Sequence, residues 1–272
     1  MSTTANYILG HENPELERLQ IQARLIEKVS RRLLRECGIG PGMRVLEIGC
    51  GPGDMSMLLA EAVGDNGSVV AFDREEHPVA LARRRARLAG FENIDFVVTT
   101  DDALPSHPPF DAVVGRYVLM HQPDPTAMVR RAAEAAKHGG IVAFHEIALR
   151  VDVRSLPPVA LFDRVSACLG SAFARLLPHH DIGERLVGCF EDAGLPGPEL
   201  IWESIAGVAN SPIMPWAAET YRIMLPHIER LGIEHGDIGD PDTLAQRLKE
   251  EVAAAKAQVV TKPQTCAWAR RP

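Results

Sequence analysis

Apolar residues follow two different periods along the chain, and the pattern changes near residue 150. Between residues 38 and 150, short runs rich in valine and isoleucine alternate with segments whose apolar residues recur at helical spacing. The runs predict strands over 43–49, 68–73, 94–100, 110–116 and 140–147, and the other segments predict helices over 55–63, 77–89 and 125–137. Strands without polar alternation are typical of a parallel sheet covered on both faces. The alternation of strands and helices therefore predicts a doubly wound α/β fold.

Helical periodicity also marks both ends of the chain. An amphipathic helix is predicted over 14–37, with Asn13 as its cap and Pro14 at its first position. Beyond residue 150 frequent prolines separate the segments. These predict helices over 161–177, 183–194, 213–231 and 241–252, the last capped by Asp240, and strands within 199–207 and 257–270. We interpret 151–272 as sheet completion plus helices inserted over a pocket, in one domain with a lid helix over 1–37 and a core over 38–150.

Composition removes several classes of function. The 272 residues are 46% hydrophobic and 24% charged, with a net charge of −7, which disfavours a nucleic-acid partner. No apolar run is long enough for a membrane span, and the first residues lack the pattern of a signal peptide. The 5 cysteines form no CxxC pair, so a zinc site or disulfide framework is not expected. Free thiols favour a cytoplasmic protein.

A glycine-rich loop after the first core strand carries the strongest chemical signal. The sequence VLEIGCGPGD (45–54) takes a buried strand into Gly49, Gly51 and Gly53, and a helix follows. Glycine lets the backbone turn sharply and approach a ligand closely, and the helix N-terminus offers N–H groups to an anion. Open α/β sheets bind small ligands at the carboxyl ends of their strands. We therefore expect a nucleotide-like cofactor at this loop.

The spacing of the loop separates two classes of cofactor. A dinucleotide loop follows GxGxxG, but here Asp54 stands at the third glycine position and the spacing is GxGxG. Glu47, two residues before the first glycine, is a second departure. Both features favour S-adenosylmethionine over NAD. Asp73 ends the second strand and is expected to accept hydrogen bonds from ribose hydroxyls, the alternative being a helix-capping role.

Further segments complete a resemblance to a known family. They are VVAFD (69–73), DDALP (101–105), FDAVVGRYVL (110–119) and HGGIVAFHE (138–146). With the glycine loop in front, residues 38–147 resemble class I S-adenosylmethionine-dependent methyltransferases, in particular the bacterial small-molecule branch related to quinone-biosynthesis methyltransferases. The resemblance implies a seven-stranded, mainly parallel sheet in the order 3-2-1-4-5-7-6, with strand seven antiparallel. It also implies that the N-terminal helix acts as a lid.

The resemblance implies roles for individual residues. S-adenosylmethionine would be the cofactor and S-adenosylhomocysteine the product. The cofactor-binding residues would be Tyr7, Glu47, Gly49, Cys50, Gly51, Gly53, Asp73, Arg74, Arg116 and Tyr117. The adenine contact stays open among Thr100, Asp101 and Asp102, because the family often has Gly-Asp-Ala here and this chain departs from that pattern.

Catalytic residues are harder to predict, because methyl transfer depends mainly on alignment of the two reactants and needs no obligatory base. His121 follows the strand predicted over 110–116, and His145 and Glu146 end the strand predicted over 140–147. All three are candidates for a base or a substrate contact. For each histidine the alternative is a structural or cofactor-contacting role.

The second half offers candidates for substrate contacts. His179 precedes a predicted helix, and Trp216 and Tyr221 lie on another, where they would either line an apolar pocket or pack the helix onto the core. His179 and His180 lack further ligands at metal-site spacing, so no metal is expected. The arginines of the helix after the second strand are expected to form a solvated face: Arg83, Arg84, Arg85 and Arg87.

These observations predict an enzyme that methylates oxygen or nitrogen of a small-molecule metabolite, in the setting of secondary metabolism. The oligomeric state is left open, with a homodimer as one option. One alternative is a protein of the same fold that binds S-adenosylmethionine without transferring methyl, for example a cyclase. The other is an NAD-dependent oxidoreductase, against which Asp54 argues.

Overall fold

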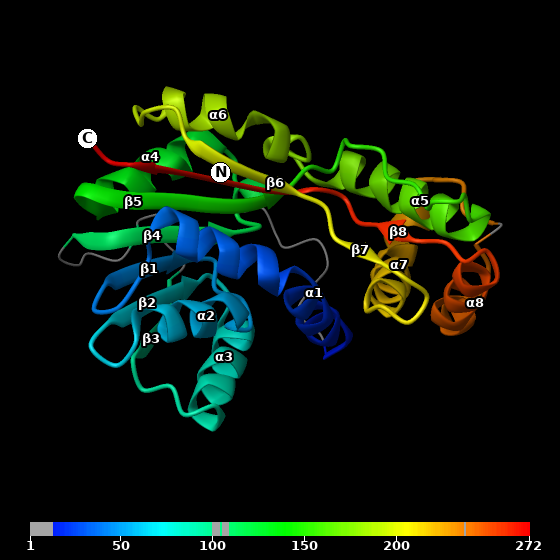
Figure 1. The fold of residues 1–272 in the computed structure, drawn as a ribbon, viewed down its shortest axis with the longest axis horizontal. Coiled ribbons are helices and arrows are strands. Elements are labelled where there is room, and N and C mark those ends of the chain that lie inside the picture. Colours follow the sequence, from blue (N-terminus) through cyan, green and yellow to red (C-terminus); the bar gives the residue numbers. More distant parts are fainter. Residues whose placement is uncertain (1–12, 100–103, 105–108, 237) are drawn as a thin grey trace. The chain divides into compact units, whose positions relative to one another are not determined.

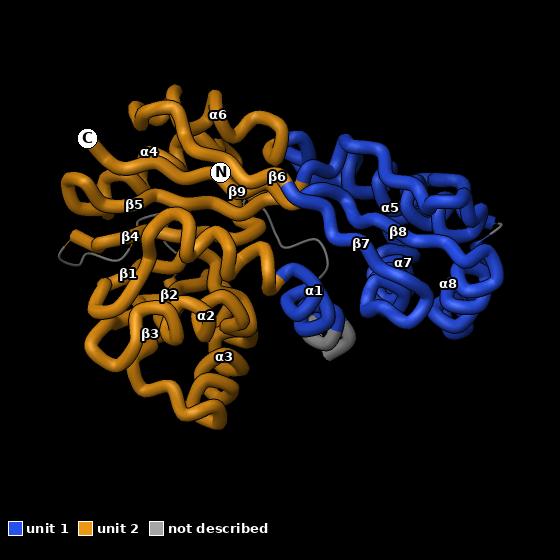
Figure 2. The backbone as a smooth tube through the Cα atoms, in the orientation of Figure 1, with its two compact units in different colours: residues 1–26, 148–181, 203–263 blue, residues 27–147, 182–202, 264–272 orange. Residues whose placement is uncertain are grey.

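The computed structural model describes residues 13–99, 104, 109–236 and 238–272. The candidate cofactor residues Tyr7, Thr100, Asp101 and Asp102 lie outside the described residues. The chain divides into two compact units that interleave along the sequence, and they are coloured separately in Figure 2. One unit consists of 27–147, 182–202 and 264–272, and the other of 1–26, 148–181 and 203–263.

A seven-stranded sheet forms the centre of the unit that contains residues 27–147 (Figure 1). The order is β3-β2-β1-β4-β5-β9-β6, and β9 runs antiparallel to β5 while the strands from β3 to β5 are parallel. The strands are β1 (Arg44–Ile48), β2 (Ser68–Asp73), β3 (Ile94–Val98), β4 (Phe110–Arg116), β5 (Ala136–Ile147), β6 (Glu199–Glu203) and β9 (Gln264–Arg270). Since β9 is the seventh strand of this sheet in chain order, the predicted order 3-2-1-4-5-7-6 is confirmed.

Helices bury the sheet because its strands are apolar on both faces. Val45, Val113 and Val142, from three neighbouring strands, are fully buried. Helices α4 and α6 pack together against β5, and α2 and α3 pack against the strands β1 to β3. The helices are α1 (Asn13–Cys37), of which 27–37 belongs to this unit, α2 (Asp54–Val63), α3 (Glu76–Leu88), α4 (Pro125–Ala135) and α6 (Ile182–Asp192).

One boundary differs from the prediction. The alanine-rich stretch 132–137 has helical propensity, and the helix was expected to reach residue 137. In the structure α4 ends at Ala135 and β5 begins at Ala136. Ala136 pairs with Phe110 of the neighbouring strand β4. Gly139 then takes a left-handed φ of 73° before the strand continues. Strand pairing therefore overrides local propensity at this position.

The unit that contains residues 203–263 is mainly helical. It contains α5 (Ala160–Leu176), α7 (Ile213–Arg230) and α8 (Pro241–Ala254), with a two-stranded sheet of β7 (Ala206–Gly207) and β8 (Val259–Val260). Its core is apolar and includes the fully buried residues Leu161, Met224 and Leu248, one from each helix. Its helices therefore share one hydrophobic core.

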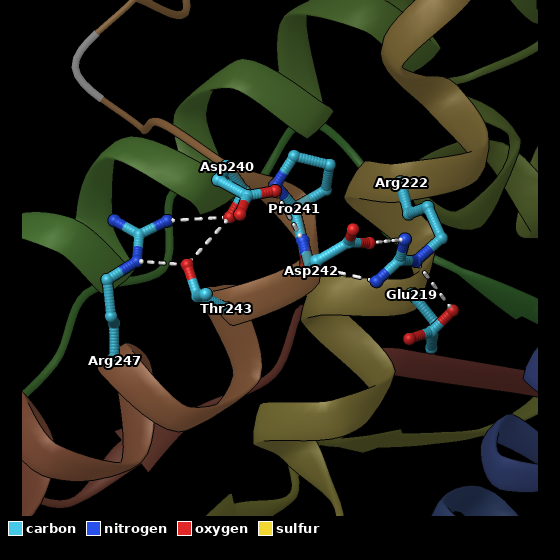
Figure 3. Close-up of polar contacts among 7 residues, drawn as sticks. All are labelled: Glu219, Arg222, Asp240, Pro241, Asp242, Thr243 and Arg247. Carbon is cyan, nitrogen blue, oxygen red and sulfur yellow. Dashed lines mark hydrogen bonds and ion pairs between the residues drawn. The ribbon is translucent and has the colours of Figure 1, made fainter.

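The start of α8 shows why this helix begins where the sequence predicts (Figure 3). The Asp240 carboxylate accepts a hydrogen bond of 2.9 Å from the Asp242 amide, and Pro241 occupies the first helical turn. Arg247 donates to the Asp240 carbonyl at 2.9 Å and to the Thr243 hydroxyl at 3.2 Å. Arg222 of α7 pairs with Asp242, which joins the two helices.

Candidate functional site

The glycine loop connects β1 to α2 at the carboxyl end of the sheet. Gly49, Gly51 and Gly53 have φ values of 69°, 49° and 86°, in the left-handed region where a side chain is strained. The loop is held from within by a 2.9 Å hydrogen bond from the Gly53 amide to the Cys50 carbonyl. The Cys50 amide bonds to the Phe72 carbonyl at 2.9 Å, which fixes the loop to the end of β2. The backbone therefore favours glycine at all three positions.

Two of these glycines also permit close packing. A Cβ at Gly49 would lie 2.8 Å from Val118 Cγ2, and a Cβ at Gly53 would lie 2.9 Å from the Ala82 Cβ of α3. At Gly51, by contrast, no atom of the described residues, apart from its two chain neighbours, lies within 4 Å of where a Cβ would stand. The loop is thus tightly packed on both sides and open at its centre, where a ligand can approach the backbone.

Asp73 lies beside the open part of the loop. One carboxylate oxygen accepts the Gly51 amide at 2.8 Å. The other accepts the amides of Arg74 at 2.7 Å and Glu75 at 3.2 Å. These bonds fix the orientation of the carboxylate, and carboxylate oxygens have lone pairs for additional donors. Asp73 is therefore a hydrogen-bond acceptor whose orientation is fixed by backbone amides at the carboxyl end of β2.

Glu47 joins the strand before the glycine loop to the helix after it. Its carboxylate is fully buried and accepts a 2.5 Å hydrogen bond from Ser56 on α2. Burial raises the pKa of Glu47 to about 7, while the Ser56 hydrogen bond and the charge of Arg116 oppose the rise. This hydrogen bond links Glu47, near the end of β1, to the first turn of α2. Glu47 therefore stabilises the loop through a buried hydrogen bond.

An ion pair that sequence reasoning missed joins α3 to the loop. Arg85 donates to both Asp54 oxygens, at 2.7 and 3.0 Å, and to the Pro52 carbonyl at 2.6 Å. The two side chains are only 22% and 15% exposed. The expectation of a solvated face is therefore wrong for Arg85, because α3 packs against the loop that precedes α2. No local signal marks this pair, since its members are 31 residues apart.

The turn after β4 packs against the loop and is fastened by Glu146. One oxygen of the buried Glu146 carboxyl group accepts the amides of Val118 at 2.9 Å and Leu119 at 2.8 Å. Val118 is the residue that packs on Gly49. Burial raises the pKa of Glu146 to about 8, against the lowering effect of the backbone hydrogen bonds. The contacts of Glu146 favour a positioning role over a contact with substrate.

Arg116 and Tyr117 precede this turn at the carboxyl end of β4. Arg116 pairs with His145 in the sheet register and donates to the Ser30 hydroxyl at 3.2 Å. Tyr117 is half-buried, has a left-handed φ of 56°, and donates its hydroxyl to Gln264. A left-handed backbone at a bulky residue is strained, and such strain is often found at functional sites. The structure therefore brings both predicted cofactor contacts to the same sheet edge as Gly49 and Asp73.

The two candidate histidines differ in their surroundings. His145 is fully buried, with Ser30 and Gln264 at its two ring nitrogens, and burial lowers its pKa to about 3. His121 ends a short 3-10 helix (Leu119–His121) and is half-buried, and burial lowers its pKa to about 4. Both side chains are therefore neutral at pH 7. The contacts of His145 favour a structural role, while His121 stays a candidate base.

The candidate substrate residues belong to the other compact unit. Tyr221 is 1% exposed and lies in the apolar core of that unit. Trp216 is half-buried and donates from its indole to Gln22 at 3.3 Å. His179 lies in the turn after α5. A substrate role for these residues stays a prediction, and the burial of Tyr221 favours the alternative that its side chain packs in a core.

Metal-binding groups, membrane-spanning helices and exposed thiols are other features that could indicate a function. The described residues contain no group of three or more side chains arranged to hold a metal ion. In the same ranges, no helix is long and apolar enough to cross a membrane. All 5 cysteines are buried free thiols. The glycine loop with its neighbours is therefore the strongest candidate site in the part of the chain that the structure describes.

Comparisons with known proteins agree with this geometry. A family model described as "Methyltransferase domain" matches residues 39–181. A ubiquinone biosynthesis O-methyltransferase of Pseudomonas fluorescens is 35% identical over 215 residues, which cover 77% of this chain and 80% of the relative. An aklanonic acid methyltransferase of a Streptomyces species is 36% identical over 118 residues, which cover 43% of this chain and 53% of the relative. The chain thus spans about half the length of the Streptomyces relative.

A solved structure extends the likeness to the fold. A putative methyltransferase from Bacillus halodurans superposes with a TM-score of 0.57 and covers 89% of this chain and 98% of its own. The identity between the two is 17%, so this likeness concerns the fold alone.

Proposed function

This chain belongs to the class I S-adenosylmethionine-dependent methyltransferase family, and we propose that it transfers a methyl group from S-adenosylmethionine to a small-molecule metabolite. Oxygen is the favoured acceptor atom, with nitrogen as the second option. The choice of oxygen is supported by the Pseudomonas fluorescens relative, whose name specifies an O-methyltransferase.

The observation that carries the proposal is the pairing of the glycine loop with Asp73. The Gly51 amide and the Asp73 carboxylate are joined at 2.8 Å, so the open backbone and the acidic acceptor lie side by side. A nucleoside presents two ribose hydroxyls as donors, and the Asp73 oxygens are suited to accept them. The open space at Gly51 fits the same ligand.

The chain's own residues would hold and orient the donor. Asp73 would bind the ribose, the backbone of 49–53 would lie against the nucleoside, and Arg116 and Tyr117 would line the other end of the site. Cys50 and Arg74 would contribute through their backbone positions in the loop and after β2. When bound, S-adenosylmethionine supplies an electrophilic methyl group on a sulfonium centre.

The rate enhancement would come mainly from alignment of the acceptor with that methyl group. A base is needed only where the acceptor must lose a proton, and it contributes about 10²–10⁴-fold. His121 is the remaining candidate for that base because its side chain is only half-buried and is neutral at pH 7, but its lowered pKa of about 4 makes it a weak one. His145 and Glu146 are fully buried and engaged by protein groups, so we assign them to support of the site.

A turnover assay tests the proposal. The protein is incubated with S-adenosylmethionine and a panel of phenols, hydroxyquinones and amines, and S-adenosylhomocysteine is quantified. We expect release that depends on an acceptor of the phenol or hydroxyquinone class. Tight binding of the donor without release for any acceptor class would overturn methyl transfer in favour of a cofactor-binding protein with another activity.

A further inference from the structure

A buried hydrogen-bond network joins a helix to two neighbouring strands of the sheet that carries the proposed donor site. It joins Ser30 of α1, His145 at the end of β5 and Gln264 at the start of β9, and we call these three residues the Ser30 network. Ser30 and His145 are fully buried, and Gln264 is 2% exposed. All three belong to the same compact unit as the glycine loop. The network therefore links three elements that are far apart in the sequence.

Because the Gln264 side-chain oxygen faces His145 and Tyr117, the direction of each hydrogen bond in the network follows. The Gln264 side-chain oxygen can only accept, so His145 Nε2, at 3.1 Å, must carry the ring proton. His145 Nδ1 is then an acceptor, and the Ser30 hydroxyl donates to it at 3.2 Å. The Ser30 oxygen in turn accepts from Arg116 Nη1 at 3.2 Å. The network thus has a defined direction that starts at the Arg116 guanidinium.

The other end of the network holds Tyr117. The Tyr117 hydroxyl donates to the same Gln264 oxygen that accepts from His145. The Tyr117 amide donates to the His145 carbonyl at 2.8 Å, and the two rings meet edge-on with centroids 5.6 Å apart. A strained residue such as Tyr117, with its φ of 56°, persists only where its surroundings over-determine it. The network supplies that restraint.

We propose that Ser30, His145 and Gln264 are positioning residues that hold Arg116 and Tyr117 in the geometry that binds the methyl donor. This inference rests on the proposed function, since Arg116 and Tyr117 are proposed donor contacts. It assigns His145 a fixed Nε2–H tautomer whose other nitrogen is occupied by Ser30. It also extends the donor site to a residue of α1, 86 residues before Arg116 in the chain.

The test compares two hydroxyl deletions. Ser30→Ala removes the hydroxyl that joins Arg116 to His145. Thr265→Val removes a buried hydroxyl on β9 that has no hydrogen-bond partner within the described ranges, and it is the matched control. Tyr117→Phe removes a single oxygen from the other end of the network and carries the test if Ser30→Ala fails to fold. Binding of S-adenosylhomocysteine is measured by calorimetry for each protein.

We expect Ser30→Ala and Tyr117→Phe each to weaken binding by about tenfold, as hydrogen bonds of this kind contribute. Thr265→Val should bind as the unmodified chain does. In ¹⁵N-histidine spectra, His145 should show the neutral Nε2–H tautomer unchanged between about pH 5 and pH 8, and Ser30→Ala should alter its Nδ1 signal.

Two results would overturn the positioning role. One is unchanged binding in the folded Ser30→Ala or Tyr117→Phe protein, and the other is a His145 ring that exchanges tautomers or titrates in that pH range. Failure of the unmodified chain to bind S-adenosylhomocysteine would instead overturn the proposed function. The tautomer measurement separates the two cases, because it does not depend on the ligand.

Discussion

Replacing Glu146 by glutamine isolates the energetic effect of a buried carboxyl group at the proposed site. The two residues have nearly the same shape, and glutamine retains a side-chain oxygen for the amides of Val118 and Leu119. Glutamine has no titratable proton. The comparison therefore separates the hydrogen-bonding role of Glu146 from its ionisation.

The pH dependence follows from the raised pKa of Glu146, about 8 in the folded protein against the ordinary 4.5. Between these values the folded state keeps a proton that the unfolded state has released, so stability falls as the pH rises. For a single such group the loss between about pH 5 and pH 8 is about 3–4 kcal/mol. The Glu146→Gln protein does not have this loss and should gain that much relative to the unmodified chain.

Urea unfolding at about pH 5, 6.5 and 8 measures this difference. Other titrating groups, such as His145 with its pKa of about 3, contribute to both proteins and cancel in the comparison. Glu146→Ala is the matched control for hydrogen bonding. It leaves two buried amides without their acceptor and should be about 2–6 kcal/mol less stable than Glu146→Gln at every pH, because neither variant titrates at this position.

Parallel pH profiles for the unmodified and glutamine proteins would refute the reasoning, because the carboxyl group would then not be protonated in the folded state. Equal stability of Glu146→Gln and Glu146→Ala would refute the assigned role in fastening the turn.

Three further changes test other parts of the account. Gly49→Ala forces a Cβ against Val118 at a φ of 69°, so it should destabilise the fold by about 1–3 kcal/mol in urea unfolding and weaken donor binding in calorimetry. Arg85→Ala should cost about 1–3 kcal/mol in the same unfolding assay, and Arg85→Lys should recover only part of it because lysine lacks the two-pronged contact with Asp54. His121→Ala should lower the turnover of a phenolic acceptor by about 10²–10⁴-fold if His121 is the base, and a loss below about tenfold would exclude that role.

The strands of the core and the glycine loop could be predicted because their signals are local, whereas the order of the strands in the sheet was implied by the resemblance to a known family. Valine-rich runs mark the strands, and the spacing of Gly49, Gly51 and Gly53 marks a turn whose left-handed backbone favours glycine. The cap at Asp240 was predicted for the same reason. The early start of β5 at Ala136 was missed, because its pairing with Phe110 is a long-range contact that overrides an alanine-rich helical signal.

The interior of the site was less predictable, because partners distant in sequence decide it. His145 lies at the expected strand end, but its contact with Ser30 spans 115 residues and its contact with Gln264 spans 119. Those two contacts change its interpretation from a candidate base to a residue fixed by hydrogen bonds. Arg85 was expected in solvent because four arginines in a short helical stretch give no sign that one of them reaches Asp54.

The most direct test of the central claim is a calorimetric titration of the cofactor-stripped protein with S-adenosylhomocysteine and with NADH. Asp73→Asn is compared with Asp95→Asn, which changes an exposed aspartate of β3 in the same sheet. We predict micromolar binding of S-adenosylhomocysteine by the unmodified and Asp95→Asn proteins, about 10–100-fold weaker binding by Asp73→Asn, and no binding of NADH. Equal affinity of the two variants, or binding of NADH in place of S-adenosylhomocysteine, would contradict the account.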